Sequence, residues 1–487
     1  MRNPFKRNRK ERTPGQKAND NILGLTYAVV LVFVLLFGYS AHFLLFQREQ
    51  VINNSYNARL DRFAQKVVRG RIFAADGTAL AETALQEDGT ETRVYPFGEV
   101  YAHAVGYSVR GKTGLESLAN FYLLSSHVSP LERLAADLSG TKTQGDDVYT
   151  TLDPGLQQAA YDALGDRRGA IVALEPSTGK VLAMVSRPGF DPNTLNEDWE
   201  RIVTEESGQA RLLNRASQGM YPPGSVFKMV MLLEYMREHP DDYEAFQFDC
   251  SGVYQVSDGG ETYSIQCYHQ TAHGQQNLKE AFANSCNGAF ASLGLMLDPA
   301  GIRQTAQELL FNQELPLSIA YEKSRFALEE GADVWEVLQT SIGQGRTQAS
   351  PMHIAMITAA AANGGVLMEP YLIQKTESAA GETIREFSPR EYGALMTEEE
   401  AQALTEMMRA VVESGTGSAL QNDRYTAAGK TGSAEYETGK ETHAWFTGFA
   451  PAEDPQIVVT VIVEEGGSGG RTAGPAARAV MDAWFSE

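Results

Sequence analysis

The sequence is short of cysteine and of basic residues, and it has a single long apolar run. Its 487 residues include 3 cysteines, too few for a disulfide framework across the whole chain. Lys and Arg number 41 against 62 Asp and Glu, a net charge of −21, which speaks against nucleic acid as the main partner because phosphate binding needs a basic face. A mean hydropathy of −0.29 excludes a polytopic membrane protein.

The apolar run lies close to the N-terminus and predicts a membrane anchor. Between Asp20 and Arg48 there is no charged residue, and the stretch 22–46 holds 25 residues. A helix of that length covers about 37 Å, enough to cross a hydrocarbon core of about 30 Å. A cleaved signal peptide is the alternative, but the run exceeds the usual apolar region of about 7–15 residues. We therefore expect an uncleaved anchor over residues 21–47.

Charge is distributed unevenly along the chain and predicts the orientation of that anchor. Residues 1–20 carry seven bases and two acids, which leaves 34 bases and 60 acids for the other residues. Because positive residues stay on the cytoplasmic side, the N-terminus is expected in the cytoplasm and residues 48–487 outside it. Residues 1–20 are predicted to be a disordered basic tail.

The part outside the membrane is predicted to contain two domains. Residues 48–147 form a small mixed segment with short strands and an Asp76-Gly77 turn. Residues 148–487 alternate between strands and helices. Within them we expect a hairpin (170–174 with 180–185), a helix (225–239), three antiparallel strands (425–436, 443–450 and 456–464) and a last helix (475–485).

Three short segments could carry chemistry, and two of them also occur as second copies. Ser225-Val226-Phe227-Lys228 begins a predicted helix, where the i, i+3 spacing places both side chains on one face, as a serine nucleophile with a lysine base requires. A second Ser-x-x-Lys, Ser177 to Lys180, lies in the hairpin turn, where no shared face exists. Lys430-Thr431-Gly432 lies on a predicted strand, whereas the other Lys-Thr-Gly, at Lys112, precedes the serine.

The third segment, Ser285-Cys286-Asn287, is too short to indicate a function by itself and is informative only together with the other two. Side chains at i and i+2 of extended or loop backbone point the same way, so Ser285 and Asn287 could face one cleft. Gly429-Lys430-Thr431 also imitates the end of a phosphate-binding loop, but Arg424 stands where that loop needs glycine and a strand follows it, so nucleotide binding is rejected. Ser-x-x-Lys, Ser-x-Asn and Lys-Thr-Gly, in that order, form the set typical of penicillin-recognising serine enzymes.

With this ordered set, the sequence resembles the class B penicillin-binding proteins, which are monofunctional D,D-transpeptidases of peptidoglycan synthesis. The resemblance extends from the anchor to about residue 485 and includes further segments. These are Arg69-Gly70-Arg71-Ile72-Phe73, Gly114-Leu115-Glu116, Thr150-Thr151-Leu152-Asp153, Asn214-Arg215-Ala216, Tyr221-Pro222-Pro223-Gly224, Gly343-Gln344-Gly345 and Trp445-Phe446-Thr447-Gly448-Phe449-Ala450.

The resemblance implies a fold and a domain order. It implies an α/β (α+β) transpeptidase domain like that of penicillin-binding proteins and serine β-lactamases, with a five-stranded antiparallel sheet flanked by helices. A single transmembrane helix and a small pedestal (dimerisation-type) domain precede it. The pedestal is short and no further module follows, so a division, elongation or sporulation role stays open.

The resemblance also implies a mechanism without a cofactor. Ser225 attacks the carbonyl between the two D-alanines of a stem peptide, and Lys228 takes its proton. This requires that the pKa of Lys228 be lowered by burial or by a second cation, which Lys430 can supply. Ser285 relays the proton and Asn287 binds the substrate backbone. The substrate-binding segment is Thr431, Gly432 and Ser433, with the Ser225 and Ser433 amides as oxyanion hole.

Partners and alternatives follow from the same resemblance. The expected partners are stem peptides, β-lactams as covalent inhibitors, the cytoplasmic membrane and a membrane glycan polymerase of the shape, elongation, division and sporulation (SEDS) family. A membrane-anchored β-lactam sensor and a β-lactamase are the alternatives on the same fold. A β-lactamase needs a base that activates water, and the one candidate, Glu308, is predicted to be an exposed helix residue.

The three cysteines fall within 37 residues, and three states stay open for them. Cys250, Cys267 and Cys286 with His273 could hold a structural zinc ion. Alternatively, Cys250 and Cys267 form a disulfide, which the oxidising exterior favours, or all three remain buried thiols. In each state we expect a structural role behind the site, with Cys286 pointing away from Ser285 and Asn287.

Overall fold

The computed structural model describes residues 13–43, 64–205 and 208–486. The chain divides into two compact units, residues 1–58 and residues 59–487, which are described separately. In the first, helix α1 runs over Pro14–His42, and its stretch Ile22–His42 is long and apolar enough to cross a membrane.

The helix begins earlier than the sequence predicted. Residues 14–20, assigned above to a disordered tail, are its first two turns. Proline is well suited to a first helical position, and the polar residues that follow continue the helix instead of ending it. Residues 44–47 of the predicted anchor lie outside the described residues.

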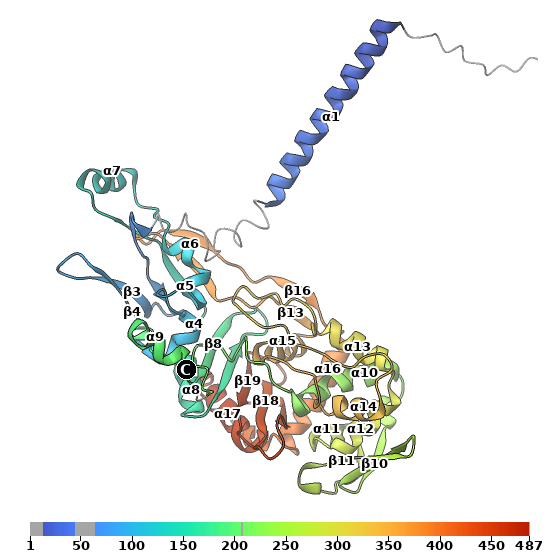
Figure 1. Cartoon of the computed structure of the whole chain (residues 1–487). Helices are drawn as coiled ribbons and strands as arrows, with labels where there is room; N and C mark the ends of the chain where they lie inside the picture. The colour runs from blue at the N-terminus through green and yellow to red at the C-terminus, as the bar shows by residue number, and fades with distance from the viewer. Residues whose placement is uncertain (1–12, 44–63, 206–207, 487) are drawn as a thin grey trace, which may run out of the picture. The chain divides into compact units, whose positions relative to one another are not determined.

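The second unit is built around a five-stranded antiparallel sheet in the order β17-β18-β19-β7-β8 (Figure 1). The strands are β7 (Gly169–Leu174), β8 (Val181–Arg187), β17 (Ala428–Ala434), β18 (His443–Ala450) and β19 (Ile457–Val463). The predicted hairpin, the three predicted strands and the five-stranded antiparallel sheet are thereby confirmed. β17 lies at one edge of the sheet.

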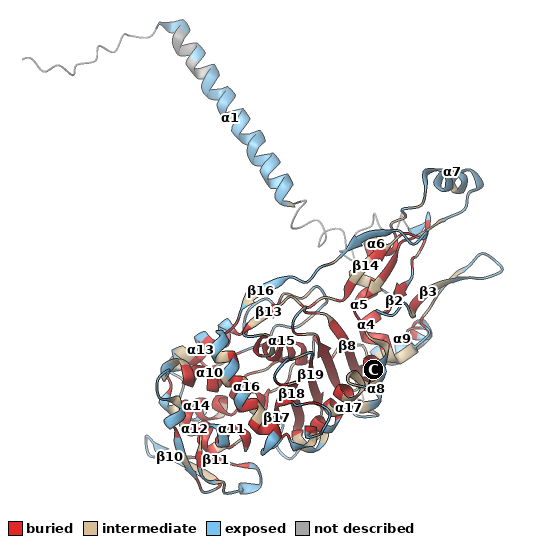
Figure 2. Cartoon of the chain, turned by 180° about the vertical axis from the view of Figure 1, so that it is seen from behind, coloured by how far each residue is buried: buried red, intermediate tan, exposed pale blue. Residues whose placement is uncertain are grey.

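Both faces of this sheet are covered, which explains why its central strands are buried throughout and mainly apolar. Every residue of β18 and β19 is buried (Figure 2). Helices α8 (Pro154–Leu164) and α17 (Gly474–Trp484) pack on one face, and α15 (Pro351–Ala362) packs on the other. Alternate strand residues therefore enter two different apolar clusters, as the two-residue period of a strand requires.

A helical part adjoins the β17 edge of the sheet (Figure 1). It contains α10 (Lys228–Glu238), α11 (Leu278–Ala283), α12 (Asn287–Met296), α13 (Pro299–Glu308), α14 (Val334–Ser341) and α16 (Glu398–Glu413). Its short strands are β9 (Gln247–Cys250), β10 (Val253–Asp258), β11 (Glu261–Gln266) and β12 (Gly274–Asn277). Side-chain caps such as Asn277 on α11 and Thr397 on α16 fix where these helices begin.

The small N-terminal part is centred on a second sheet, in the order β15-β14-β6-β2-β3-β4. Its strands are β2 (Ile72–Phe73), β3 (Ala79–Leu85), β4 (Glu91–Val94), β6 (Asp147–Thr150), β14 (Ile373–Glu377) and β15 (Thr383–Glu386). β14 and β15 come from far along the chain, so this sheet continues across the predicted border between residues 147 and 148. That border stays a prediction.

The remaining elements surround these two sheets. They are β1 (Val67–Val68), paired with β5 (Thr143–Gln144), and β13 (Val366–Met368), paired with β16 (Glu391–Ala394). The helices are α4 (Ala102–Val105), α5 (Gly114–Leu118), α6 (Asn120–Leu123), α7 (Pro130–Ser139) and α9 (Leu195–Val203).

A buried ion-pair group holds the small sheet to its helices. The Glu116 carboxylate is fully buried and accepts hydrogen bonds from Arg69 Nε at 2.6 Å and Arg93 Nε at 2.7 Å. Arg69 also donates to Asn120 Oδ1 at 2.6 Å. The segments that begin with Arg69 and with Gly114, which the resemblance singled out, therefore meet in one structural contact.

Candidate active site

The turn that carries Ser225 is fixed by two contacts from distant parts of the chain. Trp445 Nε1 on β18 donates to the Pro222 carbonyl at 3.0 Å, and the Gly224 amide donates to the Gly343 carbonyl at 2.9 Å. Gly343 has φ of +73°, and a Cβ there would lie 1.9 Å from the Gly224 carbonyl oxygen. Only glycine fits this contact, so Gly343-Gln344-Gly345 serves to position the turn.

The predicted helix over residues 225–239 has two parts. Residues Gly224–Phe227 form a 3₁₀ turn, and α10 begins at Lys228. Because a 3₁₀ helix has about 3.0 residues per turn, Ser225 and Lys228 still share a face. Ser225 lines the pocket, whereas Lys228 is fully buried below it. Within the described residues no hydrogen bond joins their side chains.

The two lysines of the predicted site meet at a single hydroxyl. Lys228 Nζ donates to the Asn287 Oδ1 and to the Ser285 carbonyl, both at 2.8 Å, and lies 3.3 Å from Ser285 Oγ. Lys430 Nζ, on β17, donates to the same Ser285 Oγ at 2.9 Å. The structure therefore brings together residues from three separate segments, as the sequence predicted.

Burial sets the protonation of these lysines. Burial lowers the pKa of Lys228 to about 8. Burial, and after it the neighbouring charge of Lys228, lowers the pKa of Lys430 well below its usual value. Of the two causes that the sequence prediction named, burial and a second cation, burial is thus the main cause of the lowered Lys228 pKa. Two adjacent buried ammonium groups cannot both keep their protons, so one amine is available as a base.

Ser285 and Asn287 face the lysine for a reason that the sequence did not give. Ser285 has left-handed backbone, with φ of +54°, and Asn287 is the first residue of α12. Of the three residues 285–287 only Cys286 has extended backbone, so the turn into the helix, and not a strand, aligns the two side chains. Cys286 between them is fully buried, and its Sγ accepts a hydrogen bond from the Ala289 amide. It belongs to the interior, as expected.

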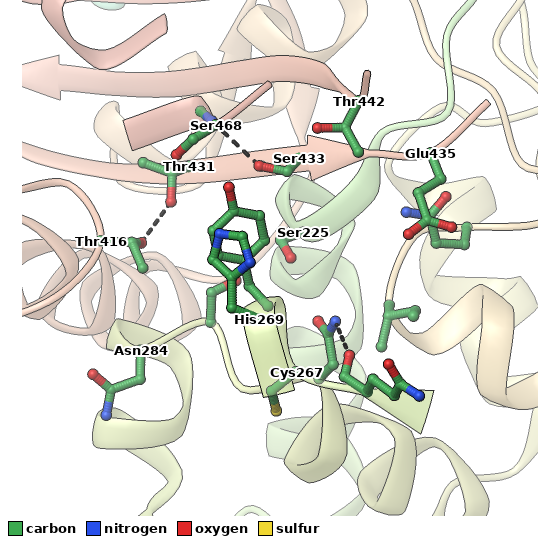
Figure 3. Close-up of a pocket in the computed structure, with 18 of the residues that line it drawn as sticks. Ser225, Cys267, His269, Asn284, Thr416, Thr431, Ser433, Glu435, Thr442 and Ser468 are labelled. Carbon is green, nitrogen blue, oxygen red and sulfur yellow. Dashed lines mark hydrogen bonds between the residues drawn. The ribbon is translucent and has the colours of Figure 1, made fainter. Parts of the chain in front are cut away.

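Strand β17 forms one wall of a pocket of about 880 Å³ (Figure 3). Thr431, Gly432 and Ser433 all line it, together with Ser225, Ser285 and Asn287. Thr431 Oγ1 is 2.5 Å from Thr416 Oγ1, and Ser433 Oγ accepts from the Gly469 amide at 3.3 Å. No sequence pattern indicated Thr416, which follows α16 and reaches the site through folding alone.

A further residue that sequence reasoning missed is Glu435, one position beyond the end of β17. With the Gln344 amide oriented by its surroundings, Gln344 Nε2 donates to the Glu435 carbonyl at 3.0 Å and Gln344 Oε1 accepts from the Glu435 amide at 3.1 Å. The Glu435 side chain is exposed and lines the pocket. Gln344 was noted only as part of a family segment, without a role.

The second copies and the alternative base lie elsewhere. Ser177 is exposed in the turn between β7 and β8, and Lys180 there pairs with Glu175 at 3.3 Å. Lys112 precedes α5 in the small domain. Glu308 ends α13, half exposed, and pairs with Arg237 at 2.8 Å. None of these side chains lines the pocket that contains Ser225.

The three cysteines and His273 form one compact cluster at the site, and Cys267 and His273 line the same pocket as Ser225. Cys250 Sγ and Cys286 Sγ each lie 3.7 Å from Cys267 Sγ, and His273 Nδ1 lies 3.4 Å from Cys250 Sγ. All four atoms lie within 4.8 Å of one another. A sulfur–sulfur bond is about 2.05 Å long, so the Cys250–Cys267 disulfide expected as one alternative is not formed in this structure.

The fold and the ordered segments in one pocket define a serine acyl-transferase of the penicillin-recognising type. Comparison with known proteins places it more closely. Residues 169–482 match the family model described as penicillin binding protein transpeptidase domain, and residues 69–148 match penicillin binding protein A dimerisation domain. The chain belongs to the penicillin-binding protein transpeptidase family, among the class B D,D-transpeptidases.

Individual relatives support the same placement. The peptidoglycan D,D-transpeptidase PbpA of Mycolicibacterium smegmatis is 32% identical, over 96% of this chain and 99% of its own length. The ceftriaxone acyl-enzyme of penicillin-binding protein A from M. tuberculosis matches with a TM-score of 0.77 at 32% identity, covering 87% of this chain and 99% of that one. A D,D-transpeptidase domain from Eggerthella lenta matches with a TM-score of 0.76 at 31% identity, covering 86% and 98%.

Proposed function

We propose that this protein cross-links peptidoglycan by acyl transfer through Ser225. Ser225 attacks the carbonyl between the two D-alanines of a stem peptide, forms an ester and releases D-alanine. The amine of a neighbouring stem peptide then attacks the ester and restores the serine. The observation that carries this proposal is the hydrogen-bonded contact of buried Lys228 and Lys430 with Ser285 and Asn287, which line one pocket with Ser225.

The buried group assigns a role to each polar side chain. Lys228, with its pKa lowered to about 8, takes the proton of Ser225. Ser285 Oγ, between the two lysine nitrogens, relays that proton toward the leaving amine. Asn287 holds Lys228 through Oδ1 and is free to bind substrate backbone only by rearranging its Nδ2, which now donates to the Gln266 carbonyl at 2.9 Å.

The wall of the pocket supplies substrate contacts. The amides of Ser225 and Ser433 form the oxyanion hole, and each such donor is typically worth about 10²–10³ in rate. The hydroxyls of Thr431 and Ser433 bind the terminal carboxylate. A Cβ on Gly432 would lie 3.1 Å from Trp445 Cβ and 3.3 Å from the Pro223 carbonyl oxygen, so this glycine lets the turn before Ser225 pack against the strand. Lys430 adds positive charge when it is the protonated member of the pair. No step requires a cofactor.

Labelling with a fluorescent penicillin tests this function. We expect one covalent adduct on the full-length protein, lost in Ser225→Ala and retained in Ser177→Ala, which removes the matched serine of the second Ser-x-x-Lys. Labelling that depends on Ser177 and persists in Ser225→Ala would refute the assignment.

We further propose that Cys250, Cys267, Cys286 and His273 hold a structural zinc ion. Tetrahedral Zn²⁺ with Zn–S bonds of about 2.3 Å places its sulfur ligands about 3.8 Å apart, close to the two 3.7 Å separations. The hydrogen bond between Cys286 and Cys267 lowers the pKa of Cys267 and raises the pKa of Cys286, so the ion would have to displace the proton that the two sulfurs share. The ion would tie the segment Ser285–Asn287 to β9 and the loop after β11.

Metal analysis with thiol counting decides among the three states of the cluster. We expect one zinc per chain and three thiols that react only after denaturation with a chelator. One thiol and no zinc would establish the disulfide, and three thiols without zinc would establish a purely buried cluster.

We also propose that α1 anchors the body outside the cytoplasm, with the basic N-terminus inside. The apolar stretch Ile22–His42 and the preceding bases support this orientation. By family resemblance, the proposed partner is a membrane glycan polymerase of the shape, elongation, division and sporulation (SEDS) family. Co-purification of the full chain from membranes with such a polymerase tests the partnership, and an anchor-free variant is its control.

A further inference from the structure

The pocket carries opposite charges at the two ends of β17. Side chains alternate along a strand, so Thr431, Ser433 and Glu435 point to the same side, and all three line the pocket. Buried Lys430 lies at the Thr431 end, and so does Arg471, which belongs to the helical turn Gly469–Ala473. A Cβ on Gly470, beside Arg471, would lie 3.9 Å from Thr431 Cγ2. At the other end lies Glu435.

Glu435 is held in place without being neutralised. The side-chain amide of Gln344 makes two hydrogen bonds to the Glu435 main chain, at 3.0 and 3.1 Å. These bonds define the position of the Glu435 Cα from another segment of the chain. In the described part of the chain no hydrogen bond or ion pair engages its carboxylate. It is also the one carboxylate among the described side chains that line this pocket. Such an acid is available to a cationic ligand.

The proposed reaction brings a cation to this place, and the inference rests on that proposed function. A stem peptide that acts as acceptor must carry an amine, and donors are stem peptides of the same kind. With the terminal carboxylate at Thr431 and the scissile carbonyl at the Ser433 amide, the donor runs along β17 toward Glu435. One residue further along the donor, at about 3.3 Å, the residue before D-Ala-D-Ala lies level with Ala434, so that a long side chain on it can extend to Glu435.

We propose that Glu435 is a specificity residue that receives a primary ammonium group of the stem peptide, carried by the donor on the residue before the terminal dipeptide. The same chemistry could come from the acceptor amine, which would enter the same pocket. The terminal carboxylate of the donor would then lie near the cations at the Thr431 end of the pocket, and its ammonium group would lie near Glu435. This charge match fixes the direction in which the peptide binds.

The test compares two donors on three full-length proteins. The donors are Nα-acetyl-Lys-D-Ala-D-Ala and its Nα,Nε-diacetyl form, and the proteins are wild type, Glu435→Gln and the control Glu437→Gln. Glu437 is an exposed acid of the same loop that does not line the pocket. We expect wild type and Glu437→Gln to release D-alanine from the free-amine donor about 3- to 10-fold faster in kcat/KM, and Glu435→Gln to show no preference.

A second arm separates the two sources of the ammonium. The diacetyl donor forms the acyl-enzyme, and the ratio of transfer to hydrolysis is measured with an added primary amine. A ratio that falls in Glu435→Gln, with an unchanged donor preference, assigns the ammonium to the acceptor.

Penicillin labelling of all three proteins separates this inference from the proposed function. Penicillin carries no ammonium at this position, so labelling should be equal. Equal labelling without any effect of Glu435→Gln in either arm overturns the ammonium subsite alone. Loss of labelling in wild type would instead overturn the proposed function.

Discussion

At the scale of residues, the site depends on two cations buried around one hydroxyl. Ser285 Oγ lies 2.9 Å from Lys430 Nζ and 3.3 Å from Lys228 Nζ, and both lysines are fully buried. The rings of Phe290 and Phe282 lie 5.3 Å from Lys228 Nζ and Lys430 Nζ, respectively, and offer each cation only weak compensation. The pKa values of both lysines are therefore lowered, so that a neutral amine is available as the base.

The first prediction concerns pH. Only the neutral amine of Lys228 accepts a proton, so acylation of Ser225 by penicillin should rise with pH and level off above about 8, the lowered pKa. Below that value the second-order rate should fall about tenfold per pH unit. Stopped-flow or gel labelling from pH 6 to 10 measures it. A flat profile across this range would exclude Lys228 as the base.

The second prediction concerns the lifetime of the acyl-enzyme. Glu308 is engaged by Arg237 and does not line the pocket, so no water-activating base is expected from it. The penicillin adduct on Ser225 should persist for minutes to hours, because its tethered leaving amine also blocks the acceptor. Intact-mass spectrometry over time, with Glu308→Gln as comparison, measures it. Rapid return to the free mass that Glu308→Gln slows would indicate a β-lactamase.

At the scale of elements, the position of the 3₁₀ turn depends on a loop after α14. Gly343 and Gly345 both have positive φ, +73° and +78°, but they differ in what a Cβ would meet. At Gly343 it would lie 1.9 Å from the Gly224 carbonyl oxygen, whereas at Gly345 its nearest contact is 3.6 Å away. An alanine at Gly345 would therefore introduce backbone strain alone, whereas an alanine at Gly343 would add a direct clash with the turn that carries Ser225.

The third prediction uses this pair. Gly343→Ala should lower the rate of penicillin acylation by about 10²-fold or more, because the clash displaces Ser225 from its place in the site. Gly345→Ala should lose about 1–2 kcal/mol of stability from left-handed strain and keep acylation within a few-fold. Acylation rates and thermal unfolding of both variants measure this. Equal effects on acylation would show that the Gly343 contact does not position the serine.

At the scale of the whole molecule, charge and hydropathy divide the chain into a basic tail, one apolar helix and an acidic body. Seven bases precede the apolar stretch, while the rest of the chain carries an excess of acids. A single crossing with the body outside the cytoplasm satisfies this distribution.

The fourth prediction follows from that topology. Protease added to intact spheroplasts should remove the body and leave only a small fragment that contains the tail and anchor. Permeabilised cells, in which the tail is also cleaved, are the control. A protected band at the full 53.2 kDa would contradict the orientation.

The sequence by itself determined the local elements and the order of the reactive segments. Strands β18 and β19 are mainly apolar, with Thr447 and Thr460 among their residues, and α17 has Pro475 in its first turn. The β7–β8 hairpin is marked by Glu175-Pro176-Ser177-Thr178-Gly179. These features depend on residues close in sequence, so their patterns can be read directly. The nucleophile segment was separated from its second copy by the same local reasoning.

Only the tertiary structure decided which distant residues meet. It pairs β19 with β7, brings β14 into the sheet of the small domain, and joins Thr416 to Thr431 and Gln344 to Glu435. It also determined the left-handed backbone of Ser285 and the 3.7 Å sulfur spacings, which differ from the disulfide that was one of three open alternatives. Such contacts arise from packing and loop closure across long separations, for which no local pattern in the chain codes.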